Sequence, residues 1–234
     1  MTMKRTLLFL GFVLCFTFAK ASYILIPMDA ETQQEHLKAY GITYWTLDQD
    51  LKVKWLLNYR GGSFLLPDSE DIRKECTIRG VTYEVLSDSA TDQILSEIES
   101  PSQNMEAVIL EKAPKIAVYT PDSKVPWDDA VTMVLTYAEI PYKTIYDKAV
   151  LDDQLILYDW LHLHHEDFTG QYGKFYRAYR SAPWYIKEKA EAEALATELG
   201  YSKVSEEKLD VSLKIRDYVA VSYTHLTLPT ICSV

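Results

Sequence analysis

The chain has few cysteines, few glycines and fewer basic than acidic residues. Of its three cysteines, only Cys76 lies in the central part of the chain, so no disulfide can form there. None of the eight glycines opens a helix with the spacing of a phosphate-binding loop. With 24 basic and 34 acidic residues and no basic stripe, the surface would repel nucleic acid. We therefore expect no disulfide scaffold, no phosphate-cradling loop and no nucleic-acid partner.

The first 21 residues have the three parts of a secretory signal. A basic start is followed by an apolar run at 7–18 and by a small-x-small cleavage site at Ala19 and Ala21. The run is shorter than the roughly 20 residues that cross a bilayer. Cleavage after Ala21 would remove three basic and no acidic residues, which changes the net charge from −10 to −13. We expect a periplasmic or secreted protein with no transmembrane anchor after cleavage.

Residues 22–100 are predicted to form a small N-terminal α/β module. Asp29 is expected to cap its first helix and Gly41 to end it. The two glycines after Arg60 predict a hairpin turn. Cys76 falls in a helical pattern, where we expect a small packed residue and not a nucleophile. Strands are expected at 23–27, 42–47, 51–57, 63–66 and 81–86, and helices at 29–41, 68–80 and 89–99.

Residues 101–114 are interpreted as the rest of a polar linker, which begins at Ser100, and a lead-in strand at 105–110. Residues 115–219 form the second predicted module, in which strands alternate with helices. This alternation is typical of a parallel sheet with helices on both faces. Strands are expected at 115–119, 142–146 and 155–161, and helices at 127–138, 172–180, 184–199 and 205–219.

The last residues of the chain differ in character from the rest. The string AVSYTHLTLPT at 220–230 resembles one reading frame of a sequencing adapter. A further strand is due after the predicted helices, and this string begins where that strand is expected. We therefore expect a second module truncated near Val219 and a non-native tail at 220–234. The alternative is a genuine β-rich C-terminus, because the string alternates acceptably for a strand.

Three of the five histidines cluster at the end of the predicted strand 155–161. In open α/β sheets, ligands bind outside the carboxyl ends of the strands. His162 and His164 would share one face of a continuing strand, and Glu166 and Asp167 follow with carboxylate oxygens. His162, His164 and Glu166 are therefore candidate catalytic groups, or all four residues form a divalent-metal site. A third interpretation is structural, with the imidazoles capping the strand and bonding the next loop.

Three segments carry a resemblance to a known family, namely IPMD at 26–29, WLLNYRGGSF at 55–64 and DWLHLHHEDF at 159–168. With them, residues 22–219 resemble exported bacterial proteins labelled asparagine synthetase B. The second module is similar to the flavodoxin-like sheet of class I glutamine amidotransferases and trehalose-utilisation proteins. In such amidotransferases the catalytic cysteine follows a later strand, so the resemblance implies a fold but no catalytic cysteine here.

The chain also lacks what an authentic asparagine synthetase needs. Cleavage after Ala21 would leave Ser22 and not a cysteine at the N-terminus, and no Ser-Gly-Gly-x-Asp-Ser loop is present. The expected function is an exported amidotransferase-like protein, either a hydrolase with a site at 162–167 or a non-catalytic ligand-binding or envelope-assembly module. A divalent metal is the one cofactor considered, and a small molecule or an envelope component is the expected partner.

Overall fold

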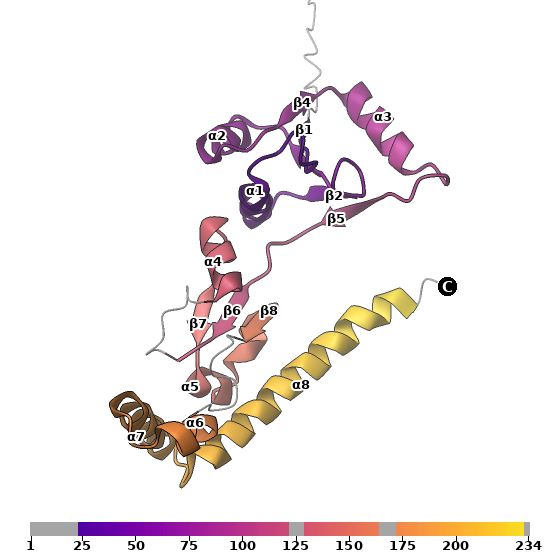
Figure 1. Ribbon diagram of the computed structural model, residues 1–234. Helices are drawn as coiled ribbons and strands as arrows, with labels where there is room; N and C mark the ends of the chain where they lie inside the picture. Colours follow the sequence, from indigo (N-terminus) through magenta and orange to yellow (C-terminus); the bar gives the residue numbers. More distant parts are fainter. Residues whose placement is uncertain (1–22, 122–128, 164–171, 232–234) are drawn as a thin grey trace, which may run out of the picture.

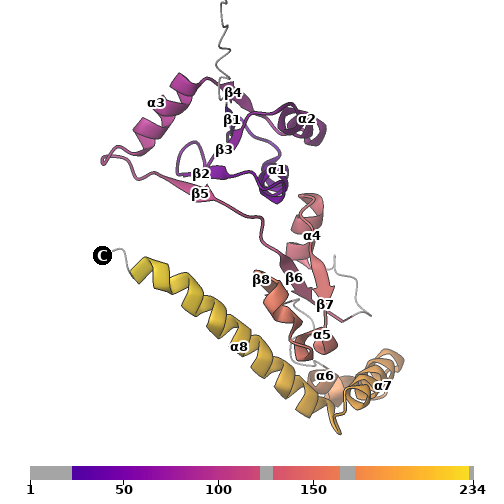
Figure 2. The ribbon, with the colours of Figure 1, turned by 180° about the vertical axis from the view of Figure 1, so that it is seen from behind.

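The computed structural model describes residues 23–121, 129–163 and 172–231. They form two α/β modules, one after the other along the chain (Figures 1 and 2). The strands are β1 (Tyr23–Ile26), β2 (Val53–Leu57), β3 (Phe64–Pro67), β4 (Glu84–Leu86), β5 (Glu106–Leu110), β6 (Ile116–Tyr119), β7 (Lys143–Ile145) and β8 (Trp160–Leu163). The helices are α1 (His36–Asp48), α2 (Glu70–Arg79), α3 (Asp88–Ile98), α4 (Ala130–Tyr137), α5 (Asp147–Leu151), the 3-10 helix η2 (Gln154–Leu157), α6 (Tyr172–Tyr179), α7 (Pro183–Glu198) and α8 (Val204–Ile231).

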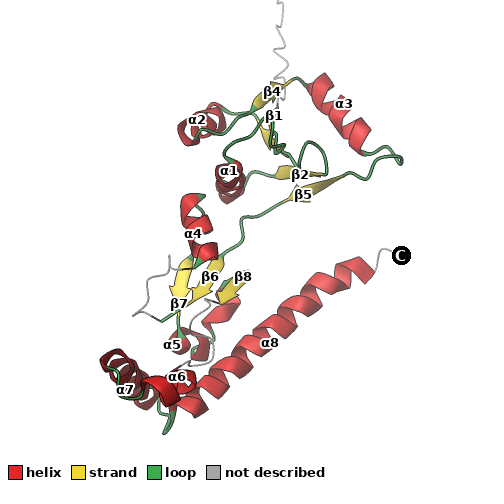
Figure 3. Cartoon of the chain, viewed as in Figure 1, coloured by secondary structure: helices red, strands yellow, loops and turns green. Residues whose placement is uncertain are grey.

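Each module is built around its own sheet, drawn in yellow in Figure 3. The first sheet is antiparallel, with the order β4-β1-β3-β2-β5. The second is parallel, with the order β7-β6-β8. Its central strand β6 is apolar and buried at every position, as a strand covered on both faces must be. The predicted parallel sheet in the second module is confirmed.

The hairpin predicted at the two glycines is present. β2 pairs antiparallel with β3, and Trp55 lies opposite Phe64. The turn requires left-handed backbone conformations, with φ of 79° at Gly61 and 90° at Gly62. A Cβ on Gly61 would also lie 2.4 Å from the carbonyl oxygen of Met28. Glycine is therefore required at this position for two independent reasons.

The first helix runs through the glycine that was expected to end it. α1 continues past Gly41 to Asp48, so residues 42–47 are helical and the predicted strand is wrong. Gly41 does not adopt a left-handed φ. A Cβ there would lie 1.8 Å from the carbonyl oxygen of Ala138 at the end of α4, so this glycine allows two helices to touch. Asp29 does not cap α1, because it accepts a hydrogen bond within a turn that precedes the helix.

The strand expected to lead into the second module belongs to the first sheet. β5 pairs with β2 over its whole length, beginning with Leu110 opposite Val53. The polar stretch 100–104, predicted to link the modules, is instead the loop between α3 and β5. Because β5 completes an edge of the first sheet, the segment that connects the two sheets is only 111–115.

Helices cover both faces of the parallel sheet (Figures 1 and 2). The side chains of Ala117 and Tyr119 pack in a core cluster with α5 and α8. His162 lies beside Val118 in the register of β8 and β6, so it points to the opposite face. There it contacts Asp129 at the start of α4. The sheet therefore separates α4 from α5 and α8.

The stretch 155–161, predicted as one strand, divides between η2 and β8. Leu155 is buried, whereas Ile156 is 85% exposed, as in a single helical turn on a surface. The backbone N–H groups of Asp159 and Trp160 both donate to the carbonyl oxygen of Lys115, which starts the pairing of β8 with β6. The strand begins later than predicted, and His162 consequently lies within it.

The three predicted C-terminal helices are confirmed as α6, α7 and α8. α8 continues to Ile231 and so crosses the predicted boundary at Val219. The non-native origin of 220–234 stays a prediction. Over the ranges that the structure describes, no helix is both long enough and apolar enough to span a bilayer.

The two modules meet where α1 packs against α4. Lys38 on α1 and Arg79 on α2 both contact Glu139, with N···O distances of 2.7 Å and 3.4 Å. The hydroxyl of Tyr44 donates to the carbonyl oxygen of Pro114 at 2.9 Å. Next to these contacts the two modules line an apolar cavity that is open to solvent on one side.

Candidate functional site

Of the four residues predicted at the strand end, the structure describes only His162. His164, Glu166 and Asp167 lie outside the described residues, so their catalytic or metal-binding roles stay predictions. His162 is the third residue of β8, and its side chain is 17% exposed. A histidine this deep in the sheet needs a hydrogen-bond partner.

That partner is a carboxylate from a different element. Nε2 of His162 lies 2.9 Å from Oδ1 of Asp129, the residue that caps α4. The same oxygen accepts the backbone N–H groups of Val131 and Thr132 at 2.8 Å and 3.3 Å. An aspartate just before a helix is a recognisable N-cap signal in a sequence. No comparable signal indicated that this aspartate would face His162.

The surroundings of Asp129 keep its carboxylate ionised. Burial raises the pKa of Asp129, but the N–H groups of Val131 and Thr132 and the contact with His162 outweigh burial and lower the pKa from 3.8 to about 2. An ionised carboxylate can only accept hydrogen bonds, so Nε2 of His162 carries the hydrogen. In the neutral imidazole the lone pair is then on Nδ1. His162 is thus oriented to take up a proton, or to bind a metal, through Nδ1.

The His162–Asp129 pair lies where the strand order of the parallel sheet changes direction. From β6 the chain crosses to β7 on one side and then returns to β8 on the other. β8 carries His162 near its carboxyl end, and Asp129 begins the helix that follows β6. In open α/β sheets, ligands bind outside the carboxyl ends of the strands at such a switch point. The pair therefore occupies the edge of the sheet where a ligand is expected.

The other face of the sheet carries a second polar group, the Lys208 cluster, formed by Tyr119, Tyr146, Asp147 and Lys208. Nζ of Lys208 lies 2.6 Å from Oδ2 of Asp147, 2.8 Å from the Tyr146 hydroxyl and 3.3 Å from the Tyr119 hydroxyl. The Tyr119 hydroxyl donates in turn to Oδ1 of Asp147. Nζ also lies 4.3 Å from the centre of the Tyr146 ring, a favourable cation–π distance.

The contacts of the Lys208 cluster are those of a structural group. Asp147 is fully buried and the Lys208 side chain is 10% exposed, so water does not compete for them. The three donors of the ammonium group match the three oxygens around it. Sequence reasoning missed this cluster, because Asp147 and Lys208 are 61 residues apart and neither belongs to a local motif. We assign the cluster to the stability of the fold.

Two of the segments that carry the family resemblance meet in the first module. Nε of Arg60 lies 3.1 Å from Oδ2 of Asp29, and its Nη1 lies 2.8 Å from Oε1 of Glu84. A hydrogen bond from Thr32, together with the Arg60 guanidinium, keeps the pKa of Asp29 below its usual value against the opposing effect of burial. The backbone N–H of Met28 donates to the carbonyl oxygen of Arg60 at 3.0 Å. These residues hold a hairpin turn against the end of β1.

Cys76 is a packed core residue, as predicted. It is completely buried in the core cluster of the first module. Burial raises the pKa of its thiol to about 12, with a smaller contribution from Glu75. At neutral pH the thiolate is therefore essentially absent, and this cysteine is not a nucleophile.

Within the described ranges, no group of three or more histidine, cysteine, aspartate or glutamate side chains converges as metal ligands would. Three of the four predicted ligands lie outside those ranges, so the metal site stays a prediction. The candidate site is therefore defined by a histidine that an ionised carboxylate orients at the carboxyl end of a parallel sheet.

Comparison of the chain with family models, curated proteins and solved structures found no match.

Proposed function

We propose that the protein is a hydrolase in which His162, oriented by Asp129, acts as a general base at the carboxyl end of the parallel sheet. The contact of 2.9 Å between Nε2 and Oδ1 carries this proposal. It fixes the tautomer and directs the basic nitrogen Nδ1 away from the carboxylate. Histidine is the side chain best suited to proton transfer near neutral pH.

The chemical step needs only groups of this chain and water. Nδ1 of His162 removes a proton from a water molecule while the water oxygen attacks the carbonyl carbon of an ester or amide. The protonated imidazole then returns that proton to the leaving oxygen or nitrogen as its bond to the carbonyl carbon breaks. Asp129 stays ionised and stabilises the imidazolium that forms between the two transfers.

We also propose that the protein has an amidotransferase-like second module and is periplasmic or secreted. The first strand of the second module lies between its second and third strands, an order that matches the start of a flavodoxin-like sheet and so supports an amidotransferase-like domain. Membership of the exported family labelled asparagine synthetase B, and a periplasmic or secreted location, belong to the same proposal. Their support is the sequence of residues 1–21 and the three resemblance segments.

A divalent metal is compatible with the same histidine. Histidines that bind metals usually donate their second ring N–H to a carboxylate, as His162 does to Asp129. His164, Glu166 and Asp167 would supply the other ligands in the predicted set. When bound, the metal would lower the pKa of a water molecule, and Asp129 would keep the imidazole oriented.

The experiment is a hydrolysis assay on the purified chain and its His162→Ala variant. The substrates are p-nitrophenyl esters, followed by ammonia release from glutamine and asparagine. Removal of a general base costs roughly 100- to 10,000-fold in rate, so we expect a loss of at least about 100-fold in kcat/KM. His36→Ala is the matched control, because His36 is also half-buried but bonds the carbonyl oxygen of Met28 in the other module.

Two results would contradict the proposal. One is the absence of hydrolysis by a folded wild-type protein on every substrate class. The other is an equal loss of rate in His162→Ala and His36→Ala. Metal analysis of the same preparations distinguishes general-base catalysis from a metal site. A metal site would contain stoichiometric zinc or nickel in the wild-type protein and none in the His162→Ala variant.

A non-catalytic ligand-binding or envelope-assembly module is the second candidate function. The apolar cavity at the junction of the two modules favours it, because its lining has no carboxylate, histidine, lysine, arginine or cysteine side chain and is mostly apolar, as in many ligand-binding pockets. A protein that binds a ligand there without any hydrolytic activity would support this second candidate.

A further inference from the structure

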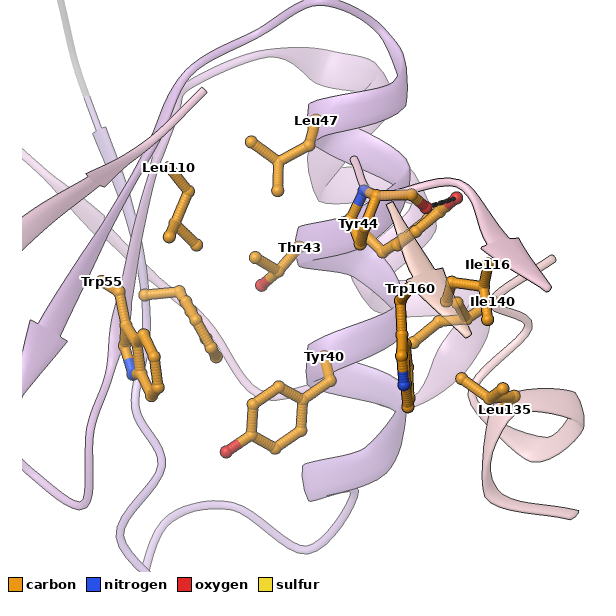
Figure 4. Close-up of a pocket in the computed structure, with 12 residues that line it drawn as sticks. Tyr40, Thr43, Tyr44, Leu47, Trp55, Leu110, Ile116, Leu135, Ile140 and Trp160 are labelled. Atoms are coloured by element: carbon orange, nitrogen blue, oxygen red, sulfur yellow. Dashed lines mark hydrogen bonds between the residues drawn. The ribbon is translucent and has the colours of Figure 1, made fainter. Parts of the chain in front are cut away.

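The cavity at the junction has walls from both modules. α1, β2, β3 and β5 form one side, and β6, α4 and β8 form the other (Figure 4). Its volume is about 230 Å³. Leu110 and Leu135 line it from the first and second modules respectively, so any occupant contacts both.

The walls carry no charge, and their deeper polar groups are already paired. The indole N–H of Trp55 donates to the carbonyl oxygen of Gly62 at 3.0 Å. The hydroxyl of Thr43 donates to the carbonyl oxygen of Ala39 at 3.0 Å. The lining residues include no acidic or basic side chain. The buried part of an ionic ligand would therefore lose hydration without compensation, so the cavity favours a neutral ligand.

Two polar groups at the opening have no such partner. The Tyr40 hydroxyl and the indole N–H of Trp160 make no hydrogen bond with any residue that the structure describes. Tyr40 is 43% exposed and Trp160 is 41% exposed, so both groups can meet a ligand from solvent. Figure 4 shows Trp55 and Trp160 on opposite sides of the cavity, with Tyr40 between them. Aromatic side chains arranged in this way favour a flat ring system.

The volume limits the size of that ring system. An apolar cavity of about 150 Å³ holds one benzene ring. A cavity of about 230 Å³ has room for two fused rings. We propose that the junction cavity binds a neutral, planar, bicyclic aromatic molecule that carries one hydroxyl or N–H group at the opening. The site is separate from the His162–Asp129 pair, so it can be occupied whether or not the protein is a hydrolase.

The test uses 2-naphthol as the probe, since it has two fused rings and a single hydroxyl. Calorimetric titration of the purified chain should give a dissociation constant of about 1 mM or tighter, which about ten ligand atoms reach at ordinary ligand efficiency. Trp160→Ala and Tyr40→Ala should each weaken binding at least about tenfold, because each removes an aromatic wall and a polar group.

Matched controls lie on α6 and α7, away from the cavity. Trp184 is 44% exposed and Tyr179 is 46% exposed, close to the values of the two lining residues. Trp184→Ala and Tyr179→Ala should leave the dissociation constant within about twofold of wild type, well inside the tenfold step that 1.4 kcal/mol produces. Equal weakening by the lining and control substitutions would overturn the proposal, as would a folded wild-type chain that does not bind 2-naphthol at several millimolar.

A measurement on the wild-type chain covers the case in which a lining variant fails to fold. Nuclear Overhauser effects from the ring protons of bound 2-naphthol should reach the methyl groups of both Leu110 and Leu135, which line the cavity from different modules. Contacts to other methyl groups instead of these would place the probe elsewhere and overturn the proposal. Binding of cyclodecanol as tight as that of 2-naphthol would overturn the aromatic class of the ligand.

Discussion

One carboxylate oxygen of Asp129 serves both a helix and a histidine. Oδ1 accepts the backbone N–H of Val131 at the start of α4 and the Nε2 hydrogen of His162 on β8. The Asp129 side chain is only 10% exposed, so water cannot readily replace either donor. The helix start and the imidazole orientation therefore depend on the same negative charge.

The substitution Asp129→Asn tests this charge, because asparagine is as good an N-cap but is neutral. The folded pKa of about 2 lies below the ordinary 3.8, so ionised Asp129 stabilises the fold above about pH 4, and this stabilisation is lost as the pH falls through 2. The shift corresponds to about 2 kcal/mol. We expect the stability advantage of wild type over Asp129→Asn to shrink by that amount from pH 6 to pH 2.

Urea unfolding at pH 6, 4 and 2 measures this difference. Ser87→Ala is the control, because Ser87 caps α3 by accepting the N–H of Ala90 and does not titrate. Its cost, about 1 kcal/mol for a lost cap, should be the same at all three pH values. A difference between wild type and Asp129→Asn that does not change with pH would contradict the assigned role of the charge.

At the scale of the element, α8 depends more on its buried ion pair with Asp147 than on an exposed ion pair such as that of Lys214. Lys208 pairs with the fully buried Asp147, whereas Lys214 on the same helix pairs with Asp153, whose side chain is 80% exposed. Solvent screens the second pair but not the first. Removing one partner of the buried pair leaves an uncompensated charge inside the protein.

We therefore expect Lys208→Met to lower the free energy of unfolding by about 3 to 5 kcal/mol. The double substitution Lys208→Met with Asp147→Leu should recover much of this loss, since neither charge then remains buried. Lys214→Met is the matched control and should cost less than about 1 kcal/mol. Urea unfolding followed by circular dichroism measures all three. A Lys208→Met cost no larger than that of Lys214→Met would show that the buried pair does not anchor α8.

Local patterns predicted those elements whose boundaries are set by local chemistry. The hairpin at Gly61 was predicted correctly, because its backbone conformation itself requires glycine. Gly41 was misinterpreted, because the reason for that glycine is Ala138, which is far away in the sequence. The segment 105–110 was correctly predicted as a strand but assigned to the wrong sheet. Its neighbour in the sheet is set by edge pairing with β2, which no local signal specifies.

The candidate site was predictable only in part for the same reason. Clustering of histidines at a strand end identified His162, because strand ends and histidines are both visible in a sequence. Its partner Asp129 lies 33 residues earlier, inside the predicted helix 127–138, and nothing in the sequence relates it to His162. Pairing across elements depends on topology, and topology emerges from the packing of the whole chain.

At the scale of the whole molecule, the two modules are held together by close packing and by a few charges. Gly41 on α1 allows the backbone of α4 to approach, since a Cβ there would overlap the carbonyl oxygen of Ala138. Glu139 receives both Lys38 and Arg79 but is itself 51% exposed. A Cβ at position 41 would meet backbone atoms of Ala138, which cannot move away by a change of rotamer. The half-exposed carboxylate of Glu139, in contrast, can be solvated if its ion pairs are lost.

The substitution Gly41→Ala should therefore destabilise the protein although alanine favours helices. Overpacking costs roughly 1 to 3 kcal/mol, and more when the contact is with backbone, against a gain in helix propensity of about 1 kcal/mol. We expect a net loss of at least about 1 kcal/mol in the free energy of unfolding. Ala194→Gly, at an exposed position in α7, measures the difference in helix propensity between alanine and glycine without a change in packing. A Gly41→Ala chain that is more stable than wild type would contradict the close approach of α1 and α4.

The substitution Glu139→Gln tests the charges at the same junction. Glu139 is half-exposed, whereas the side chains of Lys38 and Arg79 are only 18% and 9% exposed, so added salt screens these ion pairs only in part. We expect Glu139→Gln to cost less than Gly41→Ala at low salt, and this cost to fall in 1 M sodium chloride. A cost that does not change with salt would contradict a contribution from these charges.

The short connection from β5 to β6 has a mechanical consequence. β5 lies on an edge of the first sheet and continues within five residues into the centre of the second. A force that pulls the modules apart therefore acts along the axis of β5. The backbone hydrogen bonds between β5 and β2 resist it in shear, so all of them carry the force at the same time. At the end of β5 that leads into the second module, Lys52 and Glu111 form an ion pair just beyond the paired residues, with 2.6 Å between Nζ and Oε1.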